Sequence, residues 1–133
     1  MSRESEQIIR RSIDAFNRRD ADGMMESMTP DVEWVPVMGA MEGGGSFRGR
    51  AGLEAYLDGL GKAWGELQLL PDEFRDLGDR TLVIGRMLGR GHGSGVTVDT
   101  RIGVVYDWRD GKISRFRSFF DPVEALKAVG LAE

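Results

Sequence analysis

The hydrophobic period of this sequence changes near Gly65, and the change separates a helical part of the chain from a stranded part. Apolar residues recur at helical spacing over residues 4–17 and again over 53–64. Four extended stretches with short glycine-containing turns follow, at residues 66–77, 81–90, 96–108 and 112–120. Helices followed by strands predict an α+β fold whose helices pack on one face of a curved antiparallel sheet.

Shorter signals complete this organisation. Asp20 can cap a second short helix that ends before Pro30. Residues 32–38 alternate as a strand does, and Pro36 places that strand at an edge or a bulge. Asp121 can cap a last helix that ends at Gly130. With 133 residues and no repeat or linker, we expect one domain over residues 1–133.

Composition narrows the function classes. The net charge of −4 without a basic block argues against a nucleic-acid partner. The absence of cysteine and the presence of one histidine argue against a metal site, and we expect no cofactor. The N-terminus lacks the apolar core of a signal peptide, and no run of apolar residues is long enough for a membrane span. We therefore expect a soluble cytoplasmic protein.

Large apolar side chains indicate a pocket inside the sheet. Long aromatic and thioether groups that converge in a curved sheet form an adaptable apolar cavity, although core packing explains the same residues equally well. The polar candidates that would orient a ligand are Arg86, Arg101, Tyr56 and Ser118. The apolar candidates are Phe16, Trp34, Met38, Tyr56, Leu60, Trp64, Phe116 and Phe120.

Arg86 is the polar candidate with the clearest pattern. It alternates with Leu82, Ile84 and Leu88, which predicts that it points into the core. A buried guanidinium needs an anion or a carboxylate, so an inward Arg86 would bind an acidic or carbonyl-bearing ligand. The alternative is a solvated arginine at the mouth of the sheet.

The orientation of Arg101 depends on strand register. The apolar even positions from Val98 to Tyr106 would place Arg101 and Asp99 outside. A two-residue turn at 110–111 would instead pair the odd positions of this strand with Phe116, Ser118 and Phe120. A β-bulge would reconcile the two patterns, and the sequence does not locate it.

Two further features have competing interpretations. Arg115, Arg117 and Phe119 share the opposite face of the last strand, which we interpret as a homodimer interface, with a solvated face as the alternative. His92 lies in a glycine-rich hairpin tip, where a solvated turn residue is favoured over a catalytic base.

The order of several short motifs resembles a known family. The motifs are residues 15–20 (AFNRRD), 28–34 (MTPDVEW), 47–50 (FRGR) and 110–113 (DGKI). Together they resemble the SnoaL-like branch of the nuclear transport factor 2-like superfamily over nearly the whole chain. The resemblance implies a cone of curved antiparallel sheet closed by N-terminal helices, a cystatin-like roll that is often dimeric.

The catalytic patterns implied by that resemblance are incomplete here. The ketosteroid isomerase type needs a tyrosine and two aspartates, and this chain offers about Ser12, Trp34 or Pro36, and Gly103. In the epoxide hydrolase type Arg86 matches the arginine, while Leu88 and Ser118 occupy the carboxylate positions. For the cyclase type no carboxylate is assigned, although Asp99 and Asp107 lie nearby.

The sequence thus leaves the catalytic residues unknown and several functions open. The leading expectation is a cavity for a small apolar or ring-containing molecule, with an acidic or carbonyl group and with acid/base chemistry such as cyclisation, isomerisation or dehydration. The alternative is a non-catalytic ligand-binding or dimerisation module. A protein-interaction domain with a filled cone is a third reading. A carboxylate or histidine near the cavity would favour the enzyme over the binding module.

Overall fold

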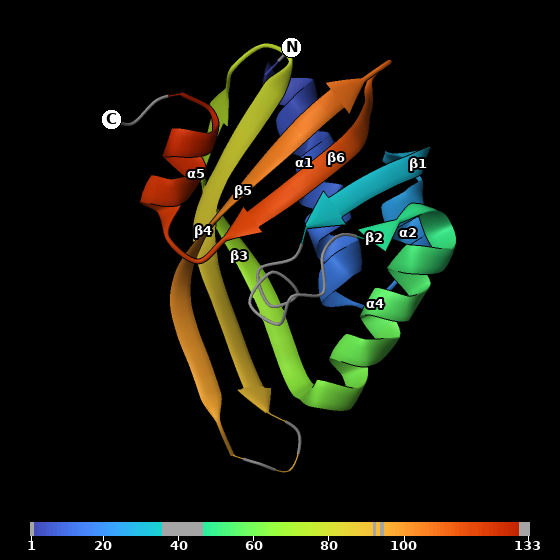
Figure 1. Cartoon of the computed structure of the whole chain (residues 1–133), viewed down its shortest axis with the longest axis vertical. Helices are drawn as coiled ribbons and strands as arrows, with labels where there is room; N and C mark the ends of the chain where they lie inside the picture. Colours follow the sequence, from blue (N-terminus) through green and yellow to red (C-terminus); the bar gives the residue numbers. More distant parts are fainter. Residues whose placement is uncertain (1, 36–46, 92, 94, 131–133) are drawn as a thin grey trace.

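The fold is built on one six-stranded sheet. The computed structural model describes residues 2–35, 47–91, 93 and 95–130, so Met38 and His92 lie outside the described residues. The strands follow the order β2-β1-β6-β5-β4-β3 across a curved sheet (Figure 1). Their bounds are β1 Met28–Val35, β2 Phe47–Arg48, β3 Trp64–Asp76, β4 Arg80–Gly91, β5 Thr97–Arg109 and β6 Lys112–Phe119.

The pairing of these strands confirms the predicted antiparallel meander from β3 to β6. The exception to antiparallel pairing is β1, which runs parallel to β6 and places Trp34 opposite Phe116. β2 pairs antiparallel with the other edge of β1. The early strand β1 is therefore joined to the sheet through the last strand of the chain.

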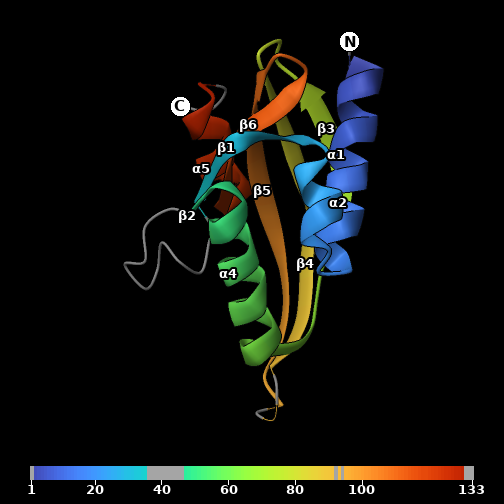
Figure 2. The ribbon, with the colours of Figure 1, turned by 90° about the vertical axis from the view of Figure 1, so that its right-hand side faces the viewer.

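Within the described residues, three helices cover one face of the sheet, which we call the inner face. They are α1 (Ser2–Asn17), α2 (Ala21–Met25) and α4 (Gly49–Ala63). Ile9 and Ile13 form the buried side of α1, and the Asp20 carboxylate accepts a hydrogen bond from the Gly23 N–H at the start of α2. In edge-on view α1 and α2 lie on one side of the sheet (Figure 2). None of the described helices is long and apolar enough to cross a membrane.

The last helix, α5 (Pro122–Ala128), covers the opposite face, which we call the outer face (Figure 2). The Asp121 side chain accepts a hydrogen bond from the Val123 N–H, and Pro122 occupies the first turn, as the sequence predicted. Ala125 is fully buried against a small apolar cluster that the sheet contributes from its outer face: Leu82, Ile84 and Val105. The sheet therefore has apolar cores on both faces.

This second core overturns the predicted facing of β4. Leu82 and Ile84 belong to the outer cluster under α5, whereas Val83 belongs to the inner core. Both faces of β4 are apolar because helices cover both faces, so an alternating pattern did not identify the inner one. The odd positions of β4 face the interior, and Met87 is the last side chain of that set to pack against the inner core.

Candidate ligand-binding site

Two small apolar cavities lie inside the fold. The first, which we call the α1 cavity, measures about 40 Å³. The second, which we call the α4 cavity, also measures about 40 Å³. Tyr56, Met87 and Ser118 line both cavities, so the two cavities adjoin at these three side chains. The interior is thus nearly filled, with two small spaces that share part of their walls.

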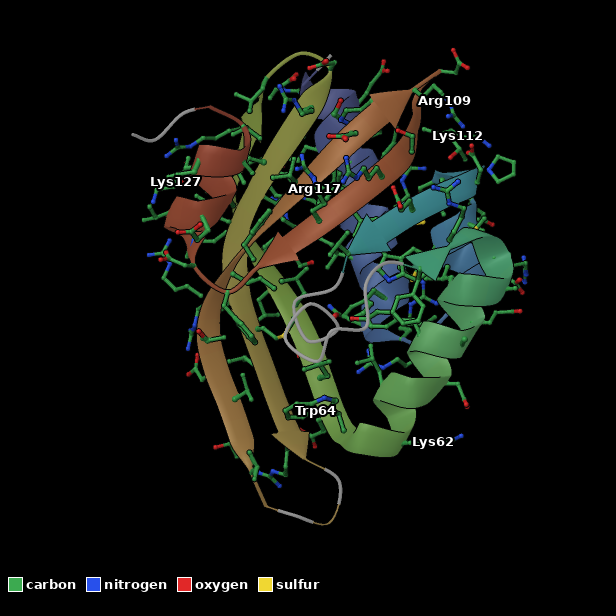
Figure 3. The ribbon with its side chains drawn as sticks, viewed as in Figure 1. Lys62, Trp64, Arg109, Lys112, Arg117 and Lys127 are labelled. Atoms are coloured by element: carbon green, nitrogen blue, oxygen red, sulfur yellow. The ribbon has the colours of Figure 1, made fainter. Side chains whose placement is uncertain are left out.

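The two cavities contain most of the predicted pocket residues. The α1 cavity is lined by Phe16, Trp34, Tyr56, Phe116 and Ser118, together with Ser12, Ile13, Met24, Leu69, Met87, Ile102, Val104 and Tyr106. The α4 cavity is lined by Tyr56, Leu60, Trp64, Ser118 and Phe120, together with Leu67, Met87 and Val98. Trp64 lies beside the end of α4 (Figure 3). Met38 lies outside the described residues.

Four stacked rings lie at the α1 cavity, and three of them, Trp34, Phe116 and Tyr106, line it. They come from neighbouring strands, and the ring centroids of successive pairs are 5.5, 5.6 and 5.7 Å apart along the row Phe47, Trp34, Phe116 and Tyr106. Tyr56 of α4 meets the Trp34 ring edge-on, with the centroids 5.8 Å apart. Strand register produces this row, because each of these residues is the cross-strand partner of the next. The row is therefore a continuous stack of aromatic rings across the four strands β2, β1, β6 and β5.

Trp34 also carries an unused hydrogen-bond donor. Its side chain is completely buried, and its indole Nε1–H finds no acceptor among the described residues. A buried donor without a partner costs about 1–3 kcal/mol, so such groups are rare in folded proteins. This unpaired donor belongs to a residue that lines the α1 cavity, where a ligand atom could accept a hydrogen bond from it.

The two tyrosines of the interior are neutral donors. Burial raises the pKa of Tyr56 to about 12, against the smaller opposing effect of nearby Arg19. Burial also raises the pKa of Tyr106 above its ordinary value. Both phenols therefore stay protonated near neutral pH, and they can donate hydrogen bonds but cannot act as bases there. Ser12 and Ser118 add two hydroxyl groups to the cavity walls.

The lining has no group suited to take a proton at neutral pH. Among the described residues that line the two cavities there is no Asp, Glu or His. Among the described residues there is also no group of three or more His, Cys, Asp or Glu placed to hold a metal ion. The interior thus offers aromatic surface and hydrogen-bond donors.

The end of α1 is fixed to β3 beside the cavities by residues that the sequence analysis did not single out. Asn17 donates to the Leu69 carbonyl at 3.0 Å and accepts from the Leu69 N–H at 2.9 Å. Arg19 donates to the carbonyls of Phe16 at 2.7 Å and Leu67 at 2.9 Å. Both belong to the family-like motif 15–20, which was a usable signal for their importance. These bonds hold Phe16 in place at the α1 cavity.

Arg86 does not enter the interior, so the inward orientation predicted for it is wrong. It points outward from β4, where its side chain is about half exposed and forms a bidentate pair with Asp99 at 2.7 Å. The hydrogen bonds that Arg86 donates to Asp99 raise the pKa of Arg86 above its ordinary value. Arg86 belongs to the same outward set as Leu82 and Ile84, but it lies beyond the cover of α5. The solvated alternative therefore describes it.

Arg101 is also exposed on the outer face, so it is not a pocket residue. The even positions of β5 face the interior, as their apolar pattern predicted, and Asp99 lies outside. The expected bulge exists. It falls where Asp107 pairs with Arg115 while Trp108 pairs with Ile113, which turns Phe116 and Ser118 inward.

The three residues assigned to a dimer interface lie on the outer face of β6. Phe119 is partly buried and packs against the apolar cluster under α5, so α5 covers part of the surface that the sequence pattern assigned to a partner. Arg117 lies over β6 on the side that faces the viewer in Figure 3. Arg115 and Arg117 neighbour acidic residues of the adjacent strands.

Comparisons with known proteins agree with this architecture. The profile of the SnoaL-like domain family matches residues 9–116. An NTF2-like protein of unknown function from Burkholderia pseudomallei is 28% identical, with a TM-score of 0.78 over 96% of this chain and 98% of its own. TerC, co-crystallised with polyporic acid, is 32% identical, with a TM-score of 0.78 over 93% of this chain and 96% of its own.

A more distant structure shares the fold alone. A protein from Xanthomonas campestris, provisionally described as a polyketide cyclase, is 23% identical, with a TM-score of 0.74 over 97% of this chain and 98% of its own. No curated protein matches the sequence. The family match covers most of the chain and agrees with the resemblance carried by the sequence motifs. The chain belongs to the SnoaL-like domain family.

Proposed function

We propose that this protein binds a small ring-containing molecule in its interior, through an oxygen that accepts hydrogen bonds. The observation that carries the proposal is the buried indole N–H of Trp34, which has no acceptor among the described residues and belongs to a cavity wall. A ligand oxygen that accepts a hydrogen bond from this N–H would remove the cost of the unpaired donor. Ligand binding would therefore stabilise the folded protein.

The chemistry of the walls supports a ring-containing ligand. The rings of Trp34 and Phe116 stack nearly parallel on each other, with an interplanar angle of 4°, and they give the cavity wall apolar aromatic contact. The hydroxyl groups of Tyr56 and Ser118 add donors where the two cavities adjoin. A carbonyl or acidic oxygen on an aromatic or quinone-like ring fits these donors. The relative TerC was crystallised with polyporic acid, and that compound is a suitable first probe.

The size of the cavities gives Met87 a role in binding. Each cavity measures about 40 Å³, whereas an apolar cavity known to hold benzene measures about 150 Å³. A ring therefore enters only if a side chain moves. Met87 lines both cavities and has a flexible, unbranched side chain, so we expect its rotation to join them. We expect the ligand to occupy the joined space.

The proposal favours binding over catalysis. Cyclisation, isomerisation or dehydration by acid/base chemistry requires a group that takes a proton in the active site. The described lining residues supply neutral phenols, hydroxyl groups and an indole N–H, but no carboxylate or imidazole. This set can hold a carbonyl oxygen and polarise it. The non-catalytic binding module is therefore the function that these residues support best.

Calorimetric titration of polyporic acid into the wild type and two tryptophan variants tests the proposal. Trp34→Phe removes the orphan donor, and we expect it to weaken binding at least about tenfold, the loss expected for a hydrogen bond to a charged or strongly accepting oxygen. Trp108→Phe is the matched control, because the Trp108 N–H already donates to the Thr81 hydroxyl at 3.0 Å. Its affinity should stay within about twofold of the wild type.

Ser118→Ala is a second variant for the case in which Trp34→Phe loses stability. It removes one hydroxyl donor from both cavity walls at little cost in volume. Equal affinity in the wild type and both interior variants would contradict the proposal, as would the absence of binding by the wild type to polyporic acid and to simpler ring ketones.

A further inference from the structure

The outer face carries a row of alternating charges that runs across five strands. Cross-strand pairing places Arg80 beside Asp107, Asp107 beside Arg115, Arg115 beside Glu33 and Glu33 beside Arg48. Opposite charges at directly paired positions stabilise a sheet by a few tenths of a kcal/mol each. Arg117 follows Arg115 on the same face of β6 and adds a third guanidinium group, after those of Arg80 and Arg115, near Asp107. The centre of the row is therefore crowded with arginine.

These arginines are only loosely paired with carboxylates. The shortest nitrogen-to-oxygen distances are 3.7 Å from Arg80 to Asp79, 3.6 Å from Arg115 to Glu33 and 4.0 Å from Arg117 to Asp107. All three exceed the usual length of a hydrogen bond between charged groups. The Nε–H groups of Arg115 and Arg117 are buried and have no acceptor among the described residues.

Asp107 has the complementary deficit. Its Oδ1 atom is buried and has no donor among the described residues. Asp107, Arg115 and Arg117 line one shallow hollow of about 410 Å³, together with Arg80. Burial lowers the pKa of Arg117, and the repulsion from Arg115 lowers it further. Two donors and one acceptor, all desolvated, thus belong to side chains that line the same hollow, and they do not satisfy one another.

We propose that this hollow binds a protonated oxyanion, of the type of hydrogen phosphate or a phosphate monoester. Once these partly exposed side chains turn toward the hollow, its negative oxygens would accept from the Nε–H groups of Arg115 and Arg117, and its O–H group would donate to Asp107 Oδ1. One ligand would then satisfy all three unpaired atoms. Two arginines and a carboxylate select for such a mixed ligand, because a fully ionised oxyanion would face the Asp107 carboxylate without a proton.

The comparison of phosphate with sulfate makes this inference testable. Near neutral pH phosphate keeps one or two protons, whereas sulfate has none, and the two ions have similar size and shape. The wild type should bind inorganic phosphate at one site per chain and at least about tenfold more tightly than sulfate at equal ionic strength, measured by calorimetry. Asp107→Asn should reduce the preference for phosphate, because an amide can donate to sulfate.

Arginine variants locate the site. Arg117→Met should weaken phosphate binding at least about tenfold, whereas Arg101→Met, an exposed arginine on the same face of β5, is the matched control and should not. Arg80→Met, whose side chain is 39% exposed, is a second variant if Arg117→Met fails to fold. Sedimentation in the presence and absence of phosphate shows whether the arginines instead bind a carboxylate of a second copy.

Three results would overturn the inference. Equal binding of phosphate and sulfate, or equal losses in Arg117→Met and Arg101→Met, would indicate a general ionic effect. The absence of phosphate binding combined with a change of oligomeric state in Arg117→Met would assign these arginines to a protein contact. This site lies on the opposite face of the sheet from the interior cavities, so its outcome is independent of the proposed ligand function.

Discussion

Tyr56 joins several properties of the interior at the scale of one residue. It meets Trp34 edge-on, it lines both cavities, and burial shifts its titration to a range far above neutrality. The phenol is therefore a fixed donor at every pH at which the protein would ordinarily work. Arg19 lies close enough to lower the pKa slightly, but desolvation is the larger effect.

This shift predicts how stability depends on pH in the alkaline range. In the unfolded chain Tyr56 should lose its proton near pH 10.0, whereas in the folded chain it keeps the proton up to about pH 12. The unfolded state then binds fewer protons, so the free energy of unfolding should fall as pH rises above about 10. Urea denaturation at several pH values between about 9 and about 11.5 measures the decline.

The variant Tyr56→Phe separates this effect from other titrations. Its free energy of unfolding should decline less steeply than that of the wild type over the same pH range. The decline that remains in the variant includes the contribution of Tyr106, because burial also raises the pKa of Tyr106. Identical slopes in the two proteins would mean that Tyr56 is not desolvated as described.

At the scale of elements, the sheet carries different ladders on its two faces. Each of the four neighbouring strands β2, β1, β6 and β5 contributes one aromatic residue to the inner row and the adjacent charged residue to the outer row, such as Phe116 and Arg115 on β6. The alternation of side chains along a strand makes this arrangement automatic once register is set. A shift of one residue in any strand would place a charge in the interior and an aromatic ring in solvent.

The docking of α5 on the outer face depends on Gly103. A Cβ atom at this position would lie 2.6 Å from the Ala125 Cβ and 3.4 Å from the Pro122 Cα. Neither atom belongs to a flexible side chain, so Gly103→Ala should push α5 away from the sheet. We expect a loss of about 1–3 kcal/mol in the free energy of unfolding, the range for overpacked cores. Chemical denaturation measures it, and proteolysis reports the release of α5.

Gly59→Ala is the matched control for this substitution. Gly59 lies inside α4, and a Cβ atom there would meet nothing within 4 Å. Alanine is the better helix former, so this variant should gain up to about 1 kcal/mol. A Gly103→Ala variant as stable as the wild type would contradict the close packing of α5 on β5 described here.

The elements themselves follow from local sequence, whereas their facing does not. The capping pattern at Asp20 and Asp121 and the turn at 110–111 predicted short elements correctly, because each depends on a few neighbouring residues. The facing of β4 failed because its two covers, the inner helices and α5, come from both ends of the sequence. Arg86, which was predicted to point inward, therefore points outward, and Met87 lies on the inner face instead.

The candidate site was predictable in its apolar part. Trp34 and Phe116 are interior because they alternate with charged neighbours on their strands, and that alternation is visible in the sequence. The missing partner of the Trp34 N–H is not visible there, because it depends on which atoms the whole fold brings near. The same reason hid the unpaired Arg117 and Asp107 atoms of the outer face.

At the scale of the whole molecule, we still expect a homodimer through the outer face in the absence of phosphate, which would compete for the same arginines. Arginine is enriched in protein interfaces, and the part of the outer face beyond α5 presents Arg80, Arg115 and Arg117. Since Phe119 packs under α5, the contact should be more polar than the sequence pattern indicated. Sedimentation velocity at micromolar concentration should detect a dimer that weakens as salt rises. A monomer at all concentrations tested would contradict this expectation.

The parallel pairing of β1 with β6 also determines when the interior can form. The Ser27 carbonyl accepts from the Ile113 N–H at 2.9 Å, and Trp34 reaches its stacking partner Phe116 only through this pairing. Contacts between segments so far apart in sequence slow folding, because a long loop must close before they form. During synthesis β1 leaves the ribosome before β6, so the side of Trp34 that packs on Phe116 stays uncovered until β6 is made. The aromatic wall is therefore completed only after residues 112–119 have been made.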